Sequence, residues 1–132
     1  MDLPTLARRF PARPDQVGPA RREAAAYARE HGAVDPDGIA LAVSEAVTNV
    51  VVHAYIDAPA PGEVELFVKR HPDDGIEIKV CDDGRGMLPR RDSPGLGVGL
   101  PLLAKLAQRF MVETRPTGGT AISMFFAVHD QA

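Results

Sequence analysis

Apolar side chains recur every three or four residues along two segments near the N-terminus, and this spacing predicts two amphipathic helices. The first is expected over about residues 16–31, with Asp15 as a candidate N-cap and Gly32 at its end. The second is expected over about residues 36–55, behind Asp35 as its N-cap and with a proline in its first turn. Both helices would lay their apolar faces on one core.

A run of three valines, at positions 50–52, interrupts this picture because β-branched residues favour a strand by intrinsic propensity. The apolar stripe nevertheless keeps helical spacing over roughly twenty residues, and propensity alone is a weak guide. We therefore expect a helix through the valines. The stripe consists of Ile39, Val43, Val47, Val50 and Ala54.

Alternating apolar and polar residues follow in the middle of the chain and predict a β-hairpin. The two runs are separated by Pro72-Asp73-Asp74-Gly75, which is a favourable turn sequence. Since one face of each run is apolar and the other polar, we expect an antiparallel pair that is covered on one side. The residues expected on the covered face are Val64, Leu66 and Val68, then Ile76, Ile78 and Val80.

The rest of the chain completes a two-layer arrangement. Residues 84–97 are punctuated by glycine and proline and are expected to form a mobile loop. The resulting order, β-α-α-β-β-α-β-β, predicts the α+β class, as a two-layer α/β sandwich with helices on one face of a mixed, mostly antiparallel sheet. The other expected elements are an extended piece at 9–13, limited to a sheet edge by its prolines, a helix at about 98–109, and strands at about 110–114 and 121–128.

The chain has 132 residues and a formal net charge of -3. This length suits a single core, so we expect one domain over residues 1–132. The negative charge gives no electrostatic reason for direct binding to nucleic acid or to an anionic membrane. Cys81 is the only cysteine, which excludes an internal disulfide, and no run resembles a signal peptide or a membrane span. We therefore expect a cytoplasmic protein.

One side of the second predicted helix carries a line of polar residues, Glu45, Asn49 and His53. Residues four apart lie about 40° apart around a helix, so this line should border the buried stripe and face a cleft. A glutamate there can accept a proton or orient a hydroxyl group, and an amide oxygen suits Mg²⁺. Taken alone, such residues more often form a solvated helix face, and His53 alone favours a capping or surface role.

A second polar segment, Asp82-Asp83-Gly84-Arg85-Gly86, comes directly after the hairpin. Asp82 leaves its strand where the sheet ends, and its carboxylate could accept a hydrogen bond from the exocyclic amine of adenine. Gly84 and Gly86 would let the backbone turn sharply and approach the base. The alternative for this segment alone is a plain strand-ending turn.

The glycine-rich segment Gly95-Leu96-Gly97-Val98-Gly99-Leu100 precedes the third predicted helix. Free N–H groups at a helix start, together with the helix dipole, bind phosphate. The segment matches neither the dinucleotide fingerprint, which follows a strand in a βαβ unit, nor the P-loop, which ends in Gly-Lys-Ser/Thr. Taken alone, it could simply be a flexible loop.

A last glycine segment, Gly118-Gly119-Thr120, leads into the final predicted strand and on its own would usually be only a hairpin turn. Arg90 and Arg91 are expected to be solvated, with a phosphate contact on loop closure as the sharper hypothesis. The histidines and the cysteine show no zinc spacing, and no nucleophile elbow is present. Taken together, the four polar and glycine segments suit a nucleotide held with Mg²⁺ between a helix layer and a sheet.

In this order the four segments resemble the N box, G1, G2 and G3 motifs of the GHKL ATPase and kinase superfamily, which includes histidine-kinase catalytic domains and DNA gyrase B. They extend over roughly residues 35–128. Within the superfamily the chain is most similar to bacterial anti-sigma factor serine/threonine kinases, because residues 41–49 (LAVSEAVTN) and then His53-Ala54-Tyr55 resemble their N box. The resemblance implies a Bergerat (histidine kinase-like) ATP-binding fold.

The resemblance also implies a role for each matched residue. Glu45 matches the catalytic base, and Asn49 matches the Mg²⁺ ligand. Asp82 matches the reader of adenine, and Thr120 matches the hydroxyl that supports adenine through water. The other nucleotide-binding residues implied by the resemblance are His53, Gly84, Gly86, Met87, Gly95, Leu96, Gly97, Val98, Gly99 and Leu100.

As to function, the resemblance implies a serine/threonine kinase that binds ATP with Mg²⁺, phosphorylates an anti-sigma factor antagonist and sequesters a sigma factor. It also implies a homodimer. The alternative is a non-catalytic, ATP-binding regulatory switch that binds a partner without phosphorylating it. The presence of Glu45 favours the kinase, since a switch needs no base. A detached ATPase that drives clamp motion is a third hypothesis, which the lack of a transducer domain in the sequence disfavours.

Overall fold

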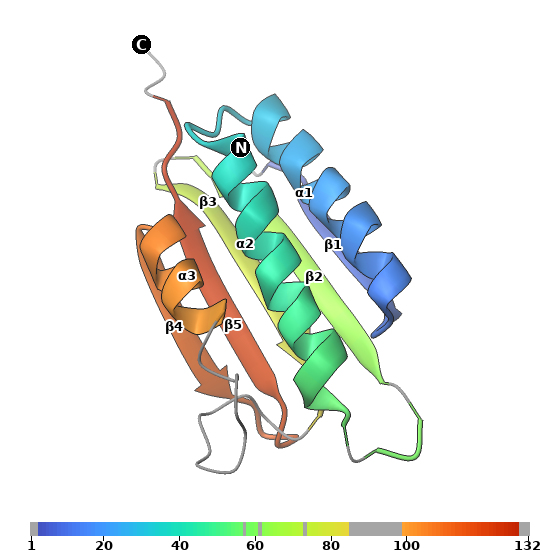
Figure 1. The fold of residues 1–132 in the computed structure, drawn as a ribbon. Coiled ribbons are helices and arrows are strands. Elements are labelled where there is room, and N and C mark those ends of the chain that lie inside the picture. The colour runs from blue at the N-terminus through green and yellow to red at the C-terminus, as the bar shows by residue number, and fades with distance from the viewer. Residues whose placement is uncertain (1–2, 57, 61, 73, 85–98, 130–132) are drawn as a thin grey trace.

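A five-stranded sheet carries the helices of the described chain on one of its faces (Figure 1). The computed structural model describes residues 3–56, 58–60, 62–72, 74–84 and 99–129. The element order confirms the predicted β-α-α-β-β-α-β-β arrangement and the α+β sandwich. The strands are β1 (Thr5–Pro11), β2 (Glu63–His71), β3 (Gly75–Asp82), β4 (Arg109–Thr114) and β5 (Thr120–Phe126); the helices are α1 (Val17–Glu30), α2 (Pro36–Asn49) and α3 (Gly99–Leu106).

The strands lie in the order β1-β2-β3-β5-β4, and each neighbouring pair is antiparallel. The described sheet is therefore more uniform than the mixed, mostly antiparallel sheet that the sequence predicts. The reason is the place of β5. β3 and β4 run in the same direction and are connected through α3, but β5 lies between them and pairs with both. A parallel pair is thereby avoided.

The β2–β3 hairpin forms the centre of the sheet, and its alternation is as predicted. Register pairs Val64 with Asp82 at one end and His71 with Gly75 at the other. The predicted inward residues of both strands are at most 1% exposed. Asp82 continues the inward row of β3, because it lies two residues beyond Val80. Its side chain therefore points to the helix-covered side of the sheet, at the end of the strand.

Helix α2 lies over the middle of the sheet and packs beside α1 (Figure 1). The predicted stripe is confirmed, since its residues are between 0% and 1% exposed. Each fully buried aliphatic side chain contributes about 1.5–3 kcal/mol relative to an exposed one. This burial explains why the valine-rich sequence is helical despite its propensity for strands. The stripe residues are Ile39, Val43, Val47, Val50 and Ala54.

The helix ends follow capping chemistry at two of the three predicted positions. The Gly38 N–H donates to the Asp35 carboxylate at 2.9 Å, which confirms Asp35 as the N-cap of α2. Gly32, just after α1, has a φ of 82°, a conformation that glycine adopts without strain. The prediction for Asp15 is wrong. The chain enters α1 through a 3₁₀ turn at Pro14–Gln16, and the Asp15 carboxylate pairs with Arg13 at 3.0 Å instead.

Beyond Asn49 the helix continues as a π-helical turn, Val50–Ala54, which contains the three valines. The segment is helical as predicted, but its hydrogen bonds span five residues instead of four. This change of spacing means that His53 does not continue the α-helical line of Glu45 and Asn49. Turns of this kind occur frequently at functional sites.

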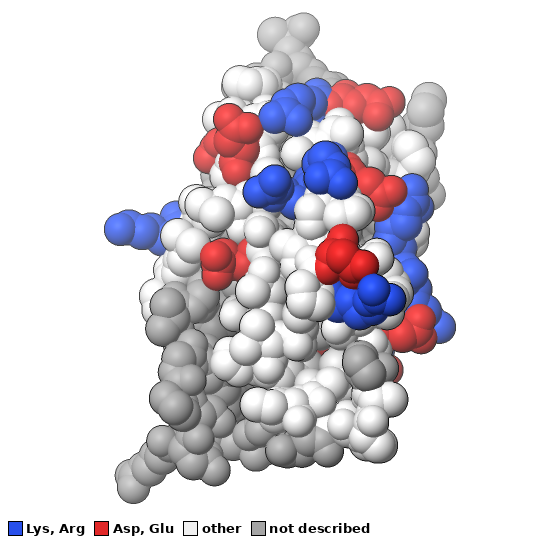
Figure 2. Space-filling model, turned by 45° about the vertical axis from the view of Figure 1, so that its right-hand side comes forward, with Lys and Arg blue, Asp and Glu red and all other residues white. Residues whose placement is uncertain are grey.

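Charged side chains of both signs alternate over the upper part of the face shown in Figure 2, whereas the lower part of the described surface is largely uncharged. Arg8 of β1 pairs with Glu23 of α1 at 3.0 Å, and Arg29 of α1 pairs with Asp37 of α2 at 3.1 Å. These pairs are exposed, and such pairs each contribute only about 0–1 kcal/mol. The apolar layer between helices and sheet, rather than these contacts, holds the fold together.

Candidate functional site

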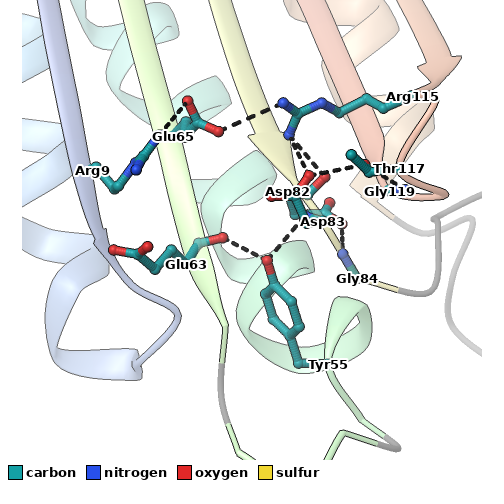
Figure 3. Close-up of polar contacts among 10 residues, drawn as sticks. All are labelled: Arg9, Tyr55, Glu63, Glu65, Asp82, Asp83, Gly84, Arg115, Thr117 and Gly119. Atoms are coloured by element: carbon teal, nitrogen blue, oxygen red, sulfur yellow. Dashed lines mark hydrogen bonds and ion pairs between the residues drawn. The ribbon is translucent and has the colours of Figure 1, made fainter.

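Three segments that are distant in sequence meet at one end of the sheet: the π turn, the turn after β3, and the turn between β4 and β5 (Figure 3). Gly84 lies against the π turn, where a Cβ atom would be 2.0 Å from the carbonyl oxygen of Ala54. Gly119 lies against the end of β3, where a Cβ atom would be 1.9 Å from the carbonyl oxygen of Asp82. No side chain fits at either position, so glycine is required for these close approaches.

The Asp82 side chain lies at the centre of this meeting point and is 2% exposed. One carboxylate oxygen, Oδ1, accepts a hydrogen bond from the Gly84 N–H at 2.8 Å. The other, Oδ2, is buried and has no hydrogen-bond partner among the described residues. Burial raises the pKa of the Asp82 carboxyl, while the backbone N–H groups of Gly84 and Thr120 oppose this change.

A second buried polar atom without a described partner belongs to Asn49, the last residue of α2. The residue is 8% exposed, and its Nδ2 has no hydrogen-bond partner in the described part of the chain. Thr120, the first residue of β5, is 2% exposed and borders the same end of the sheet. Asn49, Asp82 and Thr120 are three of the five buried polar or charged residues of the described structure. Buried polarity is thus concentrated where the motifs meet.

Unpartnered buried polar groups are rare in folded proteins, and each costs about 1–3 kcal/mol. A ligand that supplies the missing hydrogen bonds would offset this cost. The free Asp82 oxygen is an acceptor and therefore suits an N–H donor, such as the exocyclic amine of adenine. The Asn49 amide also has an oxygen of the kind that Mg²⁺ prefers. The described donors and acceptors therefore fit a purine nucleotide with a divalent ion.

On the opposite, outer side of the sheet, Arg115 holds two of the converging segments together (Figure 3). Its Nη1 donates to the carbonyl oxygen of Asp82 at 3.1 Å and lies 3.0 Å from a carboxylate oxygen of Asp83. Its Nη2 lies 3.6 Å from Glu65, which also pairs with Arg9 at 3.5 Å. The turn between β4 and β5 is therefore tied to the end of β3 and to β2.

Tyr55 ties the end of the π turn to the same strands (Figure 3). Its hydroxyl group donates to the carbonyl oxygen of Glu63 at 2.6 Å and accepts from the Asp83 N–H at 3.0 Å. Burial raises the pKa of the Tyr55 phenol, which keeps the hydroxyl protonated and able to donate. Close backbone contacts and the side chains of Tyr55 and Arg115 thus hold the three segments together.

The structure brings together several of the residues singled out in the sequence. Asn49, Asp82, Gly84 and Thr120 all lie at this end of the sheet. Glu45 lies one helical turn before Asn49 on α2, is partly exposed, and makes no hydrogen bond or ion pair with another described residue. His53 is partly exposed within the π turn. The roles of these residues remain predictions.

Of the remaining predicted site residues, two begin a described helix and the others lie outside the described part of the chain. Gly99 and Leu100 begin α3, as the predicted helix start requires. The expected loop over residues 84–97 is described only at Gly84, so its character also stays a prediction. The site residues that lie outside the described range are Gly86, Met87, Gly95, Leu96, Gly97 and Val98, together with the loop arginines Arg90 and Arg91.

Sequence reasoning missed Arg115 and the hydroxyl contacts of Tyr55. An arginine after a strand and before a turn is common on protein surfaces, so Arg115 carries no local signal. Its contacts depend on the register between strands that are far apart in sequence. Tyr55 was noted only as part of a motif. A buried tyrosine hydroxyl group usually has a hydrogen-bond partner, and this rule could have drawn attention to it.

Within the described residues, no three His, Cys, Asp or Glu side chains form a group that could hold a metal ion. This arrangement still suits Mg²⁺ bound with a nucleotide, since that ion is commonly held by one or two protein oxygens and by phosphates. Asn49 is the described residue that fits this role. None of the described helices is long and apolar enough to cross a membrane.

Comparison with known proteins supports a nucleotide-binding domain of the histidine kinase-like type. The family profile of the histidine kinase-like ATPase domain matches residues 10–126. An anti-sigma F factor of Caldanaerobacter subterraneus is 32% identical over 97 residues, which cover 65% of this chain and 66% of that protein. An anti-sigma F factor of Clostridium acetobutylicum is 29% identical over 132 residues, which cover 88% of each chain.

The match to the first of these relatives spans just under two thirds of its length. The family profile and the two relatives support the resemblance to anti-sigma factor kinases that the N box indicates. The family profile covers most of the sequence, and the described fold has the expected two layers. This chain belongs to the histidine kinase-like ATPase domain family.

Proposed function

We propose that this protein is an ATP-dependent serine/threonine kinase that acts on an anti-sigma factor antagonist and also holds a sigma factor inactive. The observation that carries the proposal is the buried carboxylate oxygen of Asp82, which lacks a described partner. It lies where the π turn and two glycine turns converge. An acceptor in this setting suits the exocyclic amine of adenine and would favour ATP over GTP, which has a carbonyl oxygen at the corresponding position.

Asn49 is the residue proposed to hold Mg²⁺. Its buried amide lies at the end of α2, where its oxygen can contribute one ligand while nucleotide phosphates contribute others. The bound ion would neutralise charge on the phosphates, which is a principal requirement of phosphoryl transfer. N–H groups at the start of α3, near Gly99, would serve the same purpose.

Glu45 is proposed to orient the hydroxyl group of the substrate serine or threonine and to accept its proton. Two features support this role. The carboxylate is partly exposed, and it makes no hydrogen bond or ion pair with another described residue, so it remains able to accept one from a substrate. It is also one helical turn from Asn49, on the same side of α2. The reacting hydroxyl and the phosphate would then approach from neighbouring positions.

The partner assignment rests on the relatives, which are named anti-sigma F factors. We propose that this chain binds a sigma factor in one nucleotide state and releases it when the antagonist competes. Such an exchange is a population shift, in which each nucleotide favours one of two complexes. The protein would act in the cytoplasm as a homodimer, without direct contact to nucleic acid or to a membrane.

The test is a transfer assay with the full chain, Mg²⁺, radiolabelled ATP and the antagonist-type protein encoded nearest to its gene. We expect label on a serine or threonine of the antagonist. Glu45→Gln should slow transfer by about a hundredfold or more, because a general base contributes about 10²–10⁴-fold. ATP affinity should change little. Glu30→Gln, an exposed carboxylate of α1, is the matched control and should leave both quantities unchanged.

Each outcome has a distinct meaning. If the Glu45 variant transfers phosphate as fast as the parent protein, the base role is wrong. If the parent binds ATP but labels no partner, the protein is the non-catalytic switch. If calorimetry with Mg²⁺ detects no ATP binding by the parent, the nucleotide site itself is refuted.

A further inference from the structure

We propose that Arg115 is a positioning residue for the nucleotide site. It lies on the outer face of the sheet, away from the helices, and holds the backbone at Asp82, the residue that would read the base. This inference rests on the proposed function, since it concerns how Asp82 is presented to a nucleotide. It assigns no contact between Arg115 and the nucleotide itself.

The guanidinium group of Arg115 bridges three groups at once. Nη1 donates to the Asp82 carbonyl oxygen at 3.1 Å and pairs with the Asp83 carboxylate at 3.0 Å. Nη2 lies 3.6 Å from the Glu65 carboxylate on β2. A planar guanidinium presents its donors in a fixed fork, so it can satisfy several acceptors while fixing their relative positions. The end of β3 is thereby held between β2 and the β4–β5 turn.

The contact acts on Asp82 through the alternation of the strand. Successive side chains of a strand point to opposite faces. The Asp82 side chain points inward, towards α2, while its carbonyl oxygen receives the Arg115 hydrogen bond from outside. Holding the Asp82 carbonyl oxygen restricts rotation of the backbone at Asp82 and so limits the directions that its side chain can take. The next peptide group carries the Gly84 N–H, which donates to the Oδ1 atom of Asp82 at 2.8 Å.

The turn that carries Arg115 is itself closed by local hydrogen bonds. The Arg115 N–H donates to the Gly119 carbonyl oxygen at 2.8 Å, and the Gly118 N–H donates to the Arg115 carbonyl oxygen at 2.8 Å. From the same turn, the Thr117 hydroxyl group donates to the Asp83 carboxylate at 2.9 Å. The backbone of Arg115 is therefore itself fixed by hydrogen bonds within the turn, so its side chain reaches Asp82 from a well-defined position. Its side chain is only 27% exposed, which limits screening by solvent.

The experiment compares Arg115→Ala and Arg115→Lys with Arg9→Ala in the full chain. Arg9 is a matched control because it pairs with the same Glu65 on the same face, but the structure shows no contact between it and Asp82 or Asp83. The affinities for ATP and GTP are measured by calorimetry with Mg²⁺, and stability is measured by urea unfolding without nucleotide. We expect Arg115→Ala to weaken ATP binding about tenfold and GTP binding less, so that selectivity for ATP falls. Arg115→Lys should recover part of the loss, and Arg9→Ala should change neither affinity.

A readout without nucleotide separates this inference from the proposed function. Hydrogen exchange at the Gly84 amide reports whether the turn after β3 is held, and the buried β3 amide of Ile78 is the internal reference. Arg115→Ala should speed exchange at Gly84 more than at Ile78, whereas Arg9→Ala should not. Unchanged exchange and an unchanged ATP-to-GTP ratio would overturn the inference, as would a loss of affinity explained entirely by unfolding. If the parent protein binds no ATP, the proposed function fails and the positioning role for a nucleotide fails with it, even where exchange at Gly84 changes.

Discussion

Buried polar side chains lie at both ends of the helix-covered sheet, but they are used differently. At the end where α1 finishes, the Tyr27 hydroxyl group donates to the Pro4 carbonyl oxygen at 2.5 Å and accepts from the Arg70 N–H at 2.9 Å. The Tyr27 ring stacks on His31 with 3.9 Å between centroids. The buried Arg70 side chain donates from Nη1 to the His71 carbonyl oxygen, although its Nε has no partner in the described structure.

The opposite end of the sheet has fewer of these internal partners. There, one oxygen of Asp82 and the amide nitrogen of Asn49 have no hydrogen-bond partner among the described residues. The buried polar residues at both ends are at most 8% exposed, so the difference does not come from exposure. The Tyr27 end uses its polar groups to connect β1, α1 and β2, which serves stability. The Asp82 end retains unused hydrogen-bonding capacity on two residues, Asn49 and Asp82, which suits the proposed nucleotide.

The largest effect is expected from Gly119→Ala at the ligand end. The new Cβ atom would lie 1.9 Å from the Asp82 carbonyl oxygen, so the β4–β5 turn must move away from β3. We expect a loss of about 3 kcal/mol in the free energy of unfolding, at the upper end of overpacking effects, together with loss of ATP binding. Gly118→Ala is the matched control, because its φ is 92° but nothing lies within 4 Å of a Cβ atom there. It should cost only about 1 kcal/mol. Urea unfolding and calorimetry decide, and equal effects of the two variants would contradict the close-approach role.

Asp82→Asn should separate stability from binding at the same end. Burial raises the pKa of Asp82 above its ordinary value of 3.8, although the Gly84 and Thr120 N–H groups oppose this. The stability that this group contributes is therefore full below pH 3.8 and is lost as the pH rises through the raised folded-state value. At pH 7 the neutral variant should unfold at a higher urea concentration than the parent protein. Its affinity for ATP should fall about ten- to a hundredfold, because a hydrogen bond to a charged group contributes about 1.5–3 kcal/mol. A variant that is both less stable and equally tight in binding ATP would refute this account.

Tyr27→Phe, at the other end of the sheet, should lower stability and leave ATP binding unchanged. It removes the hydroxyl group that serves the Pro4 carbonyl and the Arg70 N–H, and it leaves both without that partner. We expect the free energy of unfolding to fall by about 1–2 kcal/mol, as for other buried groups left unsatisfied. ATP affinity measured on the folded protein should stay within about twofold, since no contact of Tyr27 reaches the ligand end. A comparable loss of affinity would show that the two ends are coupled, and the proposed division would then be wrong.

Much of the fold could be predicted from periodicity. The stripe of α2 and the alternation of β2 and β3 are local patterns that report which side of each element is buried. The place of β5 between β3 and β4 could not be predicted this way, because strand order depends on pairings between distant segments. The π turn at Val50–Ala54 was also missed, since the hydrophobic pattern does not distinguish it from an α-helix.

The residues of the candidate site also divide into those with a local sequence signal and those that depend on pairings between distant strands. Asp82 and Gly84 could be singled out because aspartate and glycine at strand ends have recognisable turn chemistry. Thr120 was singled out only through the resemblance to a known family, and the roles of all three residues stay predictions. Arg115 could not be found, because its three contacts arise from strands that the sequence does not show to be neighbours. The phosphate-binding role of the segment from Gly95 to Val98 stays a prediction, since these residues lie outside the described range.

The interior position of β5 has a consequence for biosynthesis. β3 and β4 leave the ribosome before β5, yet each pairs with β5 in the finished sheet. A nascent chain that stops short of residue 120 therefore leaves one edge of β3 unpaired and β4 without this neighbouring strand, and it lacks Thr120 altogether. Insertion of one late strand completes the sheet and the candidate site in the same event. We therefore expect partly synthesised chains to be the form of this protein most prone to aggregation, because unpaired strand edges invite it.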